Sequence, residues 1–401
     1  MRPFTSVIPF DEAVRLVMGA AVPIERIDAV AIADADGRVL ARDVIAADDV
    51  PAFDRAAMDG YAVVAAGTSG AAAGTPRPLS CVGRLFTGET TTRVVGRGEC
   101  LEIATGAPMP AGADAVVIVE DTTRSGDRVS IRAGVTAGQN VGRRGADLRR
   151  GALVVLAGRL LGPSQVGAIA ATGTTTVDVF AKPRVAVFST GNEVVEPGRA
   201  LGPGQVHDVN RFTVSAVVAR HGCVPVPGMA IGDTVPALSA ALDRALEHDV
   251  VILSGGSSVG DRDLILDVLR ARGEVLFHGV AVKPGKPTGF AHVGHTPVFA
   301  LPGYPASCLS NTLMLVAPFL RRVARLPPSE PRTVLLPLAR RVVSTPGRHQ
   351  FYTVRIVDGR AEPAFKASGD ITSMAHADGY VEIPSEVEVL DAGAMVGVVL
   401  F

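Results

Sequence analysis

VILSGGSSVGDRD (residues 251–263), VAVKPGKPTGF (280–290) and VFALPGYPAS (298–307) are three apolar runs joined to loops rich in glycine and proline. From residue 184 onward, apolar strand-like runs alternate with helical segments, and we predict helices at 209–221, 234–247 and 262–272. This alternation predicts a parallel sheet with helices on both faces. Ligands bind beyond the carboxyl ends of the strands in such sheets. We therefore expect these loops to lie side by side and to form a binding site at one edge of the sheet.

The rest of the chain changes its pattern several times. Residues 50–150 are short Val, Ile and Ala runs cut by Gly, Pro and Thr, which predicts a small β-rich module. Residues 1–49 and 151–181 mix helix and strand patterns, and residues 332–401 again read as short strands with glycine turns. The fold class that we predict is therefore multidomain α/β, with a central α/β domain at 182–327 and a C-terminal β-barrel-like domain at 332–401.

Composition limits the classes of function. Charged residues make up 20% of the chain and the formal net charge is −1, so neither a nucleic-acid partner nor a membrane surface is implied. The four cysteines form no CxxC pair, which favours reduced thiols in a cytoplasmic protein. The longest apolar stretch, residues 151–171, is interrupted by Arg159 and Pro163, so no membrane span is expected.

The loops of the α/β domain carry groups suited to an anionic ligand. Gly255 and Gly256 follow a predicted strand and permit an exposed row of backbone N–H groups. Asp261 is expected to cap the next helix, which leaves Asp263 as the better metal-ligand candidate. Mg²⁺ needs only one or two protein carboxylates when phosphates and water complete its shell, so a pair among Glu193, Asp233 and Asp263 would suffice.

Lys283 and Lys286 place two positive charges in a loop stiffened by prolines. The loop is not a P-loop, because Pro287 stands where Ser or Thr is required, and no GxGxxG motif is present in this region. Taken alone, each lysine is as consistent with a solvated surface charge as with a phosphate contact.

The β-rich module holds a second set of polar residues. Asp59 lies in a Met-Asp-Gly-Tyr turn and Thr105 precedes a glycine and two prolines. Asp147 lies among four arginines, where an oxyanion site and a surface ion-pair cluster are both possible, and charge alone favours the ion pairs.

As a set, these segments resemble the MoeA family of molybdopterin molybdenumtransferases, which includes the E domain of gephyrin. The matching pieces run in order from residue 49 to 307: DVPAFDRAAMDGYAV, ATGAPMPAGADAVV, GQNVGRRGADL, RVAVFSTGNEV, VHDVNR, SGGSSVGDRD, KPGKPTGF and LPGYPAS. The resemblance implies that adenylylated molybdopterin and molybdate react with Mg²⁺ to give molybdenum cofactor and AMP. It also implies a homodimer whose cleft lies between the α/β domain of one subunit and the inserted module of the other. Molybdopterin adenylyltransferase and apo-molybdoenzymes are further partners that it suggests.

Carried over by motif position, the implied active residues fall into three groups. The implied catalytic residues are Asp59, Thr105, Asp147, Glu193, Asp263, Lys283 and Lys286. The implied metal ligands are Glu193, Asp233 and Asp263. The implied cofactor-binding residues are Ser189, Thr190, Gly191, Asp208, Asn210, Ser254, Gly255, Gly256, Ser258, Gly285, Pro302, Gly303 and Ser307.

Tyr304 departs from the family pattern, which has Asn in an LPGNP loop. A tyrosine reaches further and fills more space, so it could alter the pocket or the preference between molybdate and tungstate. Other functions stay open on the sequence alone: a molybdopterin adenylyltransferase, a non-catalytic pterin carrier or scaffold, and a nucleotide-pyrophosphate hydrolase.

Overall fold

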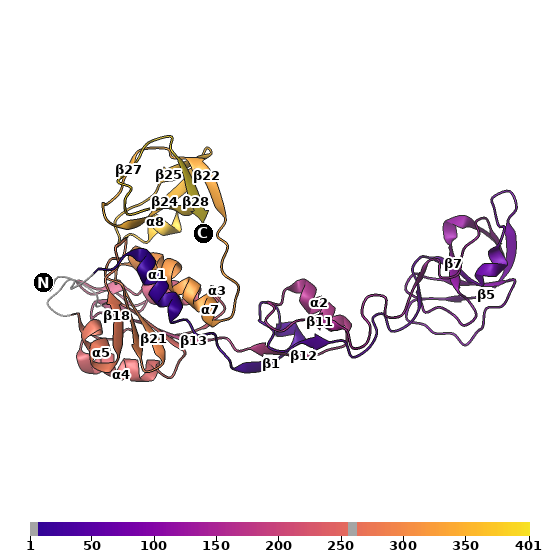
Figure 1. Cartoon of the computed structure of the whole chain (residues 1–401), viewed down its shortest axis with the longest axis horizontal. Helices are drawn as coiled ribbons and strands as arrows, with labels where there is room; N and C mark the ends of the chain where they lie inside the picture. The colour runs from indigo at the N-terminus through magenta and orange to yellow at the C-terminus, as the bar shows by residue number, and fades with distance from the viewer. Residues whose placement is uncertain (1–6, 256–262) are drawn as a thin grey trace. The chain divides into compact units, whose positions relative to one another are not determined.

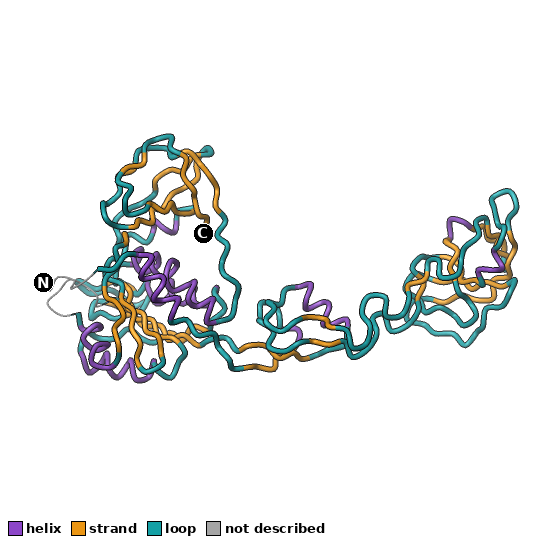
Figure 2. The backbone as a smooth tube through the Cα atoms, viewed as in Figure 1, coloured by secondary structure: helices purple, strands orange, loops and turns teal. Residues whose placement is uncertain are grey.

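The computed structural model describes residues 7–255 and 263–401. The chain forms two compact units (Figures 1 and 2). The first unit consists of Met1–Asp28, Gly37–Val39 and Phe180–Phe401, and the second consists of Ala29–Asp36 and Leu40–Val179.

A six-stranded mixed sheet is the centre of the first unit, in the order β16-β13-β17-β21-β20-β18. Five strands run in one direction, and β20 (Gly289–Val293) runs against them. The strands that share a direction are β13 (Arg184–Ser189), β16 (Val224–Pro227), β17 (Val250–Ser254), β21 (Thr296–Leu301) and the edge strand β18 (Glu274–His278), which pairs with β20. A short parallel pair, β14 (Val194–Val195) with β15 (Val206–His207), lies between β13 and the next helix in the chain.

Helices cover both faces of this sheet because successive strand residues point to opposite sides. Val185 and Ile252 face a core shared with α1, α3 and α7, whereas Ala186 and Val251 face a core shared with α4 and α5. Figure 1 shows the two helical layers on either side of the strands. The helices are α1 (Phe10–Gly19), α3 (Asn210–Arg220), α4 (Val235–Ala245), α5 (Leu264–Arg272), α6 (Pro305–Asn311), the π-helical η4 (Thr312–Val316) and α7 (Ala317–Val323).

The C-terminal part of the first unit is a β-rich domain with strand order β19-β24-β26-β28-β22. Its first strand, β19 (Val282–Lys283), comes from the lysine loop of the α/β domain and pairs in parallel with His349 and Gln350. The other elements are β22 (Thr333–Pro337), β23 (Val342–Val343), β24 (His349–Val357), β25 (Arg360–Pro363), α8 (Thr372–Ala375), β26 (Gly379–Ile383), β27 (Val389–Leu390) and β28 (Met395–Leu400).

The second unit contains a six-stranded sheet with the order β7-β4-β6-β5-β9-β8, which agrees with the β-rich module expected there. These strands are β4 (Gly60–Val63), β5 (Arg77–Leu85), β6 (Glu99–Ile103), β7 (Ala115–Ile118), β8 (Thr122–Ser125) and β9 (Arg128–Ile131). Shorter elements precede and follow it: β1 (Ile27–Ala31), η1 (Ile32–Asp34), β2 (Val44–Ile45), β3 (Arg55–Ala56), η2 (Ala65–Thr68), η3 (Val119–Asp121), β10 (Val141–Gly142), β11 (Leu153–Val155), α2 (Pro163–Ala171) and β12 (Thr176–Phe180).

The multidomain α/β fold class is confirmed, with two local corrections. The central sheet is mixed rather than parallel, because residues 289–293, for which no strand was predicted, form β20 and a hairpin with β21. The cap of α5 is Asp263, whose Oδ1 accepts from the N–H of Leu266 at 3.0 Å. Asp261, expected to cap this helix, lies outside the described residues. The boundaries that we drew at residues 50, 150, 182 and 327 stay predictions.

Candidate functional site

A cavity of about 1370 Å³ lies at the edge of the central sheet where the parallel strands end. The lysine loop reaches the same edge because it precedes β20, an antiparallel strand that starts where β21 ends, with Gly289 opposite Ala300. The predicted site residues that line this cavity are Ser189, Thr190, Glu193, Asp208, Asn210, Ser254, Gly255, Lys283, Gly285, Lys286, Pro302, Gly303 and Ser307.

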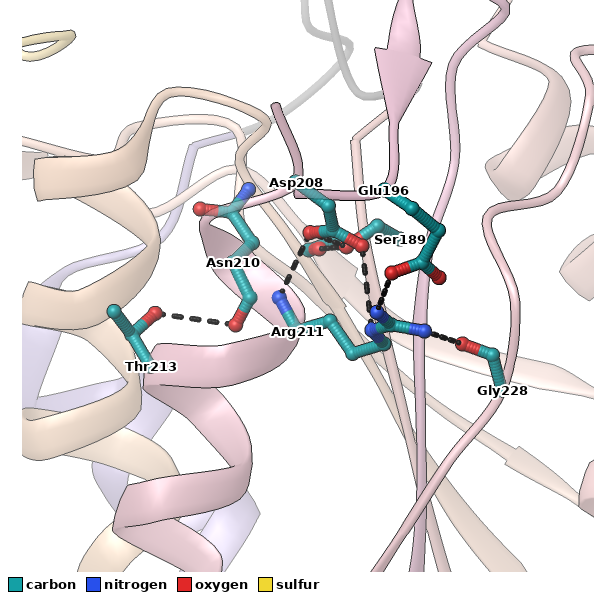
Figure 3. Close-up of polar contacts among 8 residues, drawn as sticks. Ser189, Glu196, Asp208, Asn210, Arg211, Thr213 and Gly228 are labelled. Carbon is teal, nitrogen blue, oxygen red and sulfur yellow. Dashed lines mark hydrogen bonds and ion pairs between the residues drawn. The ribbon is translucent and has the colours of Figure 1, made fainter. Parts of the chain in front are cut away.

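Ser189, Asp208 and Asn210 line the cavity and belong to a network of polar contacts around the start of α3 (Figure 3). Asp208 Oδ1 accepts from the hydroxyl of Ser189 at 2.7 Å and from the backbone N–H of Arg211 at 3.1 Å. The Arg211 guanidinium lies 3.5 Å from Asp208 Oδ2 and also contacts Glu196 and the carbonyl of Gly228. These contacts fix the start of α3 against the end of β13.

The lysine loop is fixed by a second buried network. Asn311 is fully buried, and its Nδ2 donates to the carbonyl of Gly285 at 3.1 Å and to Thr288 Oγ1 at 2.9 Å. Gly285 has φ +105, and a Cβ there would lie 1.7 Å from Asn311 Nδ2, so only glycine fits this approach. Lys283 Nζ donates to Thr345 Oγ1 at 2.8 Å. The loop is therefore rigid before any ligand arrives.

One wall of the cavity comes from the C-terminal domain, which the sequence did not reveal. Arg348 and residues 365–369 line it, and the backbone N–H of Ala306 donates to the carbonyl of Ser368 at 3.1 Å. Among the described residues, the lining carries four lysine and arginine side chains, Lys283, Lys286, Arg348 and Lys366, against the two carboxylates of Glu193 and Asp208. A preference for anionic ligands follows from this charge.

The three proposed metal ligands lie in different settings. Glu193 lines the cavity, whereas Asp233 and Asp263 are not among its lining residues. Asp263 Oδ2 lies 3.0 Å from His278 Nε2, and the helix from Val235 is capped by Thr234 rather than by Asp233. Within residues 7–255 and 263–401, no three His, Cys, Asp or Glu side chains gather as a metal site. The described carboxylates therefore fit Mg²⁺ only as one or two ligands of a shell completed by substrate phosphate and water.

The remaining predicted residues lie elsewhere. Gly191 lies just after β13 without lining the cavity, and Gly256 and Ser258 are outside the described residues. Cys308, next to Ser307, is fully buried, and burial raises the pKa of its thiol to about 12. A thiol with such a pKa is protonated at neutral pH, so Cys308 is not a nucleophile for this cavity.

In the second unit, Asp59 and Thr105 form an exposed pair. Asp59 Oδ1 accepts from the backbone N–H of Thr105 at 2.7 Å and from its hydroxyl at 2.9 Å, and these two hydrogen bonds lower the pKa of Asp59. Arg143 pairs with Asp54 at 2.8 Å and Arg144 pairs with Asp49 at 2.6 Å. Two of the four arginines around the exposed Asp147 are thus held in ion pairs.

Three family models match consecutive parts of the chain. The MoeA N-terminal region (domain I and II) matches residues 8–173, a probable molybdopterin binding domain matches 186–322, and the MoeA C-terminal region (domain IV) matches 336–401. The described helices include none that is long and apolar enough to cross a membrane.

Similar proteins cover nearly the whole chain. A protein of Mycobacterium tuberculosis named molybdopterin molybdenumtransferase 2 is 36% identical over 92% of this chain and 94% of its own length. A molybdopterin molybdenumtransferase of Staphylococcus aureus is 28% identical over 98% of this chain and 95% of its own length. The crystal structure of a molybdopterin biosynthesis MoeA protein from Pyrococcus horikosii superposes with a TM-score of 0.84 at 39% identity, covering 98% of this chain and 99% of that one.

The fold, with its anion-suited cavity at the sheet edge, defines a multidomain enzyme of the molybdopterin-binding α/β class. The chain belongs to the MoeA family, whose similar members are named as molybdopterin molybdenumtransferases. The family resemblance drawn from the sequence motifs is therefore confirmed, as is the assignment to a family of transferases.

Proposed function

We propose that this protein inserts molybdate into adenylylated molybdopterin with Mg²⁺ and releases AMP, the last step of molybdenum cofactor synthesis. The observation that carries the proposal is the composition of the cavity in a chain of this family. Its described lining combines buried polar groups with four lysine and arginine side chains. Adenylylated molybdopterin contains a pyrophosphate linkage and molybdate is an oxyanion, so both suit such a lining.

Lys283 and Lys286 are the proposed contacts for phosphate or molybdate. Their loop is held by Asn311 and by the pairing of β19 with β24, so the charges are in position before the reaction starts. Preorganised cations stabilise charge that develops on a leaving phosphate without any cost of reorganisation. Mg²⁺, when bound with the substrate, would supply further stabilisation of that charge, with Glu193, which lines the cavity, Asp233 and Asp263 as its proposed protein ligands.

We further propose a homodimer in which the inserted module of one subunit completes the cavity of the other. Asp59, Thr105 and Asp147 would then act on the ligand from the second subunit. The exposure of Asp59 and Thr105 supports this, because both are accessible on the surface of their own module.

The primary test measures AMP release from adenylylated molybdopterin with Mg²⁺, in the presence and absence of molybdate. We expect release that depends on molybdate and a product that activates an apo-molybdoenzyme. Tight pterin binding without AMP release would instead favour the carrier function. ATP-dependent adenylylation would favour the adenylyltransferase, which needs neither the inserted module nor the C-terminal domain. Release of AMP from several dinucleotides without molybdate would favour a pyrophosphate hydrolase.

Residue roles are tested with two substitutions in the same assay. Asp263→Asn and Lys286→Gln should each slow AMP release, with Lys182→Gln as the matched control because the exposed Lys182 does not line the cavity. If both substitutions leave AMP release at the wild-type rate, the proposed roles of Asp263 and Lys286 are wrong.

A further inference from the structure

Three buried oxygen atoms in residues that line the cavity have no hydrogen-bond partner among the described residues. They are Thr190 Oγ1, Asp208 Oδ2 and Asn210 Oδ1. Their residues are 2%, 4% and 7% exposed, and all three line the cavity. Buried polar groups in folded proteins are nearly always paired, so an unpaired set that lines a cavity points to a ligand.

The orientation of these oxygens is set by the groups around them. Asp208 uses Oδ1 for both of its hydrogen bonds, to Ser189 and to the backbone of Arg211 (Figure 3). This leaves Oδ2 with only the ion-pair contact to Arg211 at 3.5 Å. Asn210 donates its Nδ2 to the carbonyl of Gly303 at 2.9 Å, so the amide oxygen is the atom left to accept.

The set therefore asks for hydrogen-bond donors. An ionised carboxylate and an amide oxygen can only accept, and the threonine hydroxyl can do either. A phosphate or molybdate oxygen would be repelled by Asp208, so the anionic part of a ligand belongs at the lysine loop instead. The lining of the cavity thus contains hydrogen-bond acceptors on Asp208 and Asn210 and positive charges on Lys283 and Lys286.

We propose that Asp208 and Asn210 read the amino and ring N–H donors of the pterin and so fix the direction in which the substrate lies in the cavity. This inference rests on the proposed function for the identity of the ligand. A pterin carries an exocyclic 2-amino group beside a ring N–H, which gives two adjacent donors along one edge. A carboxylate oxygen and a neighbouring amide oxygen match that edge. Adenine lacks this pair of donors, so the adenylyl part of the substrate is expected near Lys283 and Lys286.

The test compares binding of two small fluorescent probes, pterin and lumazine, to the purified full chain. Lumazine has a carbonyl oxygen where pterin has the 2-amino group, so it places an acceptor against Asp208. We expect wild-type protein to bind pterin at least about tenfold more tightly than lumazine, since a site built for a donor rejects an analogue that lacks it. Asp208→Asn should reduce the preference for pterin over lumazine by about tenfold, because the new amide can donate a hydrogen bond to the lumazine carbonyl.

Asp243→Asn is the matched control. Asp243 is a carboxylate on α4 that pairs with Arg272 and does not line the cavity, so its substitution should keep the wild-type ratio. If Asp208→Asn does not fold, as judged by its melting temperature, Asn210→Ser removes the second acceptor and should lower the ratio in the same direction.

Equal affinities for pterin and lumazine in the wild-type protein, or no binding of either probe up to its solubility limit, would overturn the inference. So would an unchanged ratio in a folded Asp208→Asn or Asn210→Ser protein. The two proposals fail separately. If AMP release depends on molybdate but pterin and lumazine bind equally, only the proposed recognition of the pterin by Asp208 and Asn210 is wrong. If the protein discriminates between the probes but releases no AMP, the proposed reaction is wrong.

Discussion

The cavity of the first unit and the Asp59–Thr105 pair of the second unit contain similar residue types, yet they are held in different ways. Around the cavity, Asp208, Asn210 and Asn311 are more than nine-tenths buried and tied to several elements by hydrogen bonds. Asp59 and Thr105 are exposed and contact mainly each other. The first arrangement is a pocket whose polar groups are held in place by its own walls, whereas the second is a surface that can act on a ligand only when something faces it.

Among the substitutions that test this difference, we expect the largest effect from a change at Gly255. This residue has φ +108, and a Cβ there would lie 2.2 Å from the carbonyl oxygen of Thr190. We expect Gly255→Ala to reduce the free energy of unfolding by roughly 3 kcal/mol or more, because both the backbone angle and the close contact oppose it. Urea denaturation measures this. Gly126→Ala in the second unit is the control, since Gly126 has φ +58 with open space around it and should lose about 1 kcal/mol.

Next in size is the loss of charge from the lysine loop. Lys283→Gln and Lys286→Gln should each slow AMP release by about a hundredfold, because a preorganised cation acts on charge that develops during the reaction. The readout is kcat for molybdate-dependent AMP release. A rate within twofold of that of Lys182→Gln would show that these lysines only balance surface charge.

The Asp59 pair should show a smaller loss of activity and little loss of stability. Asp59→Asn is expected to slow AMP release by about tenfold, while the melting temperature falls only slightly because hydrogen bonds of an exposed side chain contribute little to stability. Mixing the two weakly active proteins, Asp59→Asn and Lys286→Gln, should raise activity to about a quarter of the wild-type value if each active site uses both subunits of a two-fold dimer. A mixture no more active than the average of the two separate proteins, with subunit exchange verified, would place each complete site within one chain.

Tyr304 tests how far the rim of the cavity affects the ligand. Its side chain is 67% exposed and lines the cavity, so Tyr304→Asn should leave the melting temperature unchanged. We expect a change of about threefold in the ratio of molybdate to tungstate use, as fits a residue at the solvent-exposed edge of a site. An unaltered ratio in AMP-release assays would remove any role of Tyr304 in anion preference.

The smallest expected effect concerns pH in the second unit. The hydrogen bonds from Thr105 lower the pKa of Asp59, so they favour its ionised form in the folded protein. The stabilising contribution is present above the ordinary pKa of about 3.9 and is lost as the pH falls through the lowered value. A titration of the Asp59 carboxyl by NMR should show this shift, and Thr105→Ala should bring the pKa back towards its ordinary value. An ordinary pKa in the wild-type protein would contradict the contact.

Local patterns were enough to predict much of the fold. The helices expected at 209–221, 234–247 and 262–272 are α3, α4 and α5, with ends that differ by at most two residues. The error at β20 has a physical cause, because the strand lies between Gly289 and Gly294, which indicate loop, and its pairing with β21 is a tertiary contact. The cap of α5 was misplaced for a similar reason, since two aspartates two residues apart are equally suited to the role.

The site was predictable only where strands end. Loops after β13, β17 and β21 converge because parallel strands share an edge, which topology alone dictates. The wall formed by Arg348 and residues 365–369 could not be predicted in this way. It depends on how the C-terminal domain packs against the α/β domain, and no local signal in those residues marks it.

The two-residue strand β19 connects the α/β domain to the sheet of the C-terminal domain. Val282 and Lys283 form an edge strand of that sheet, although they belong to the sequence of the α/β domain. A chain cut after α7 would therefore strip hydrogen-bonding partners from the backbone that carries Lys283, and the separated C-terminal fragment would expose a bare sheet edge. Neither domain taken alone would therefore keep all the backbone pairing that it has in the whole chain.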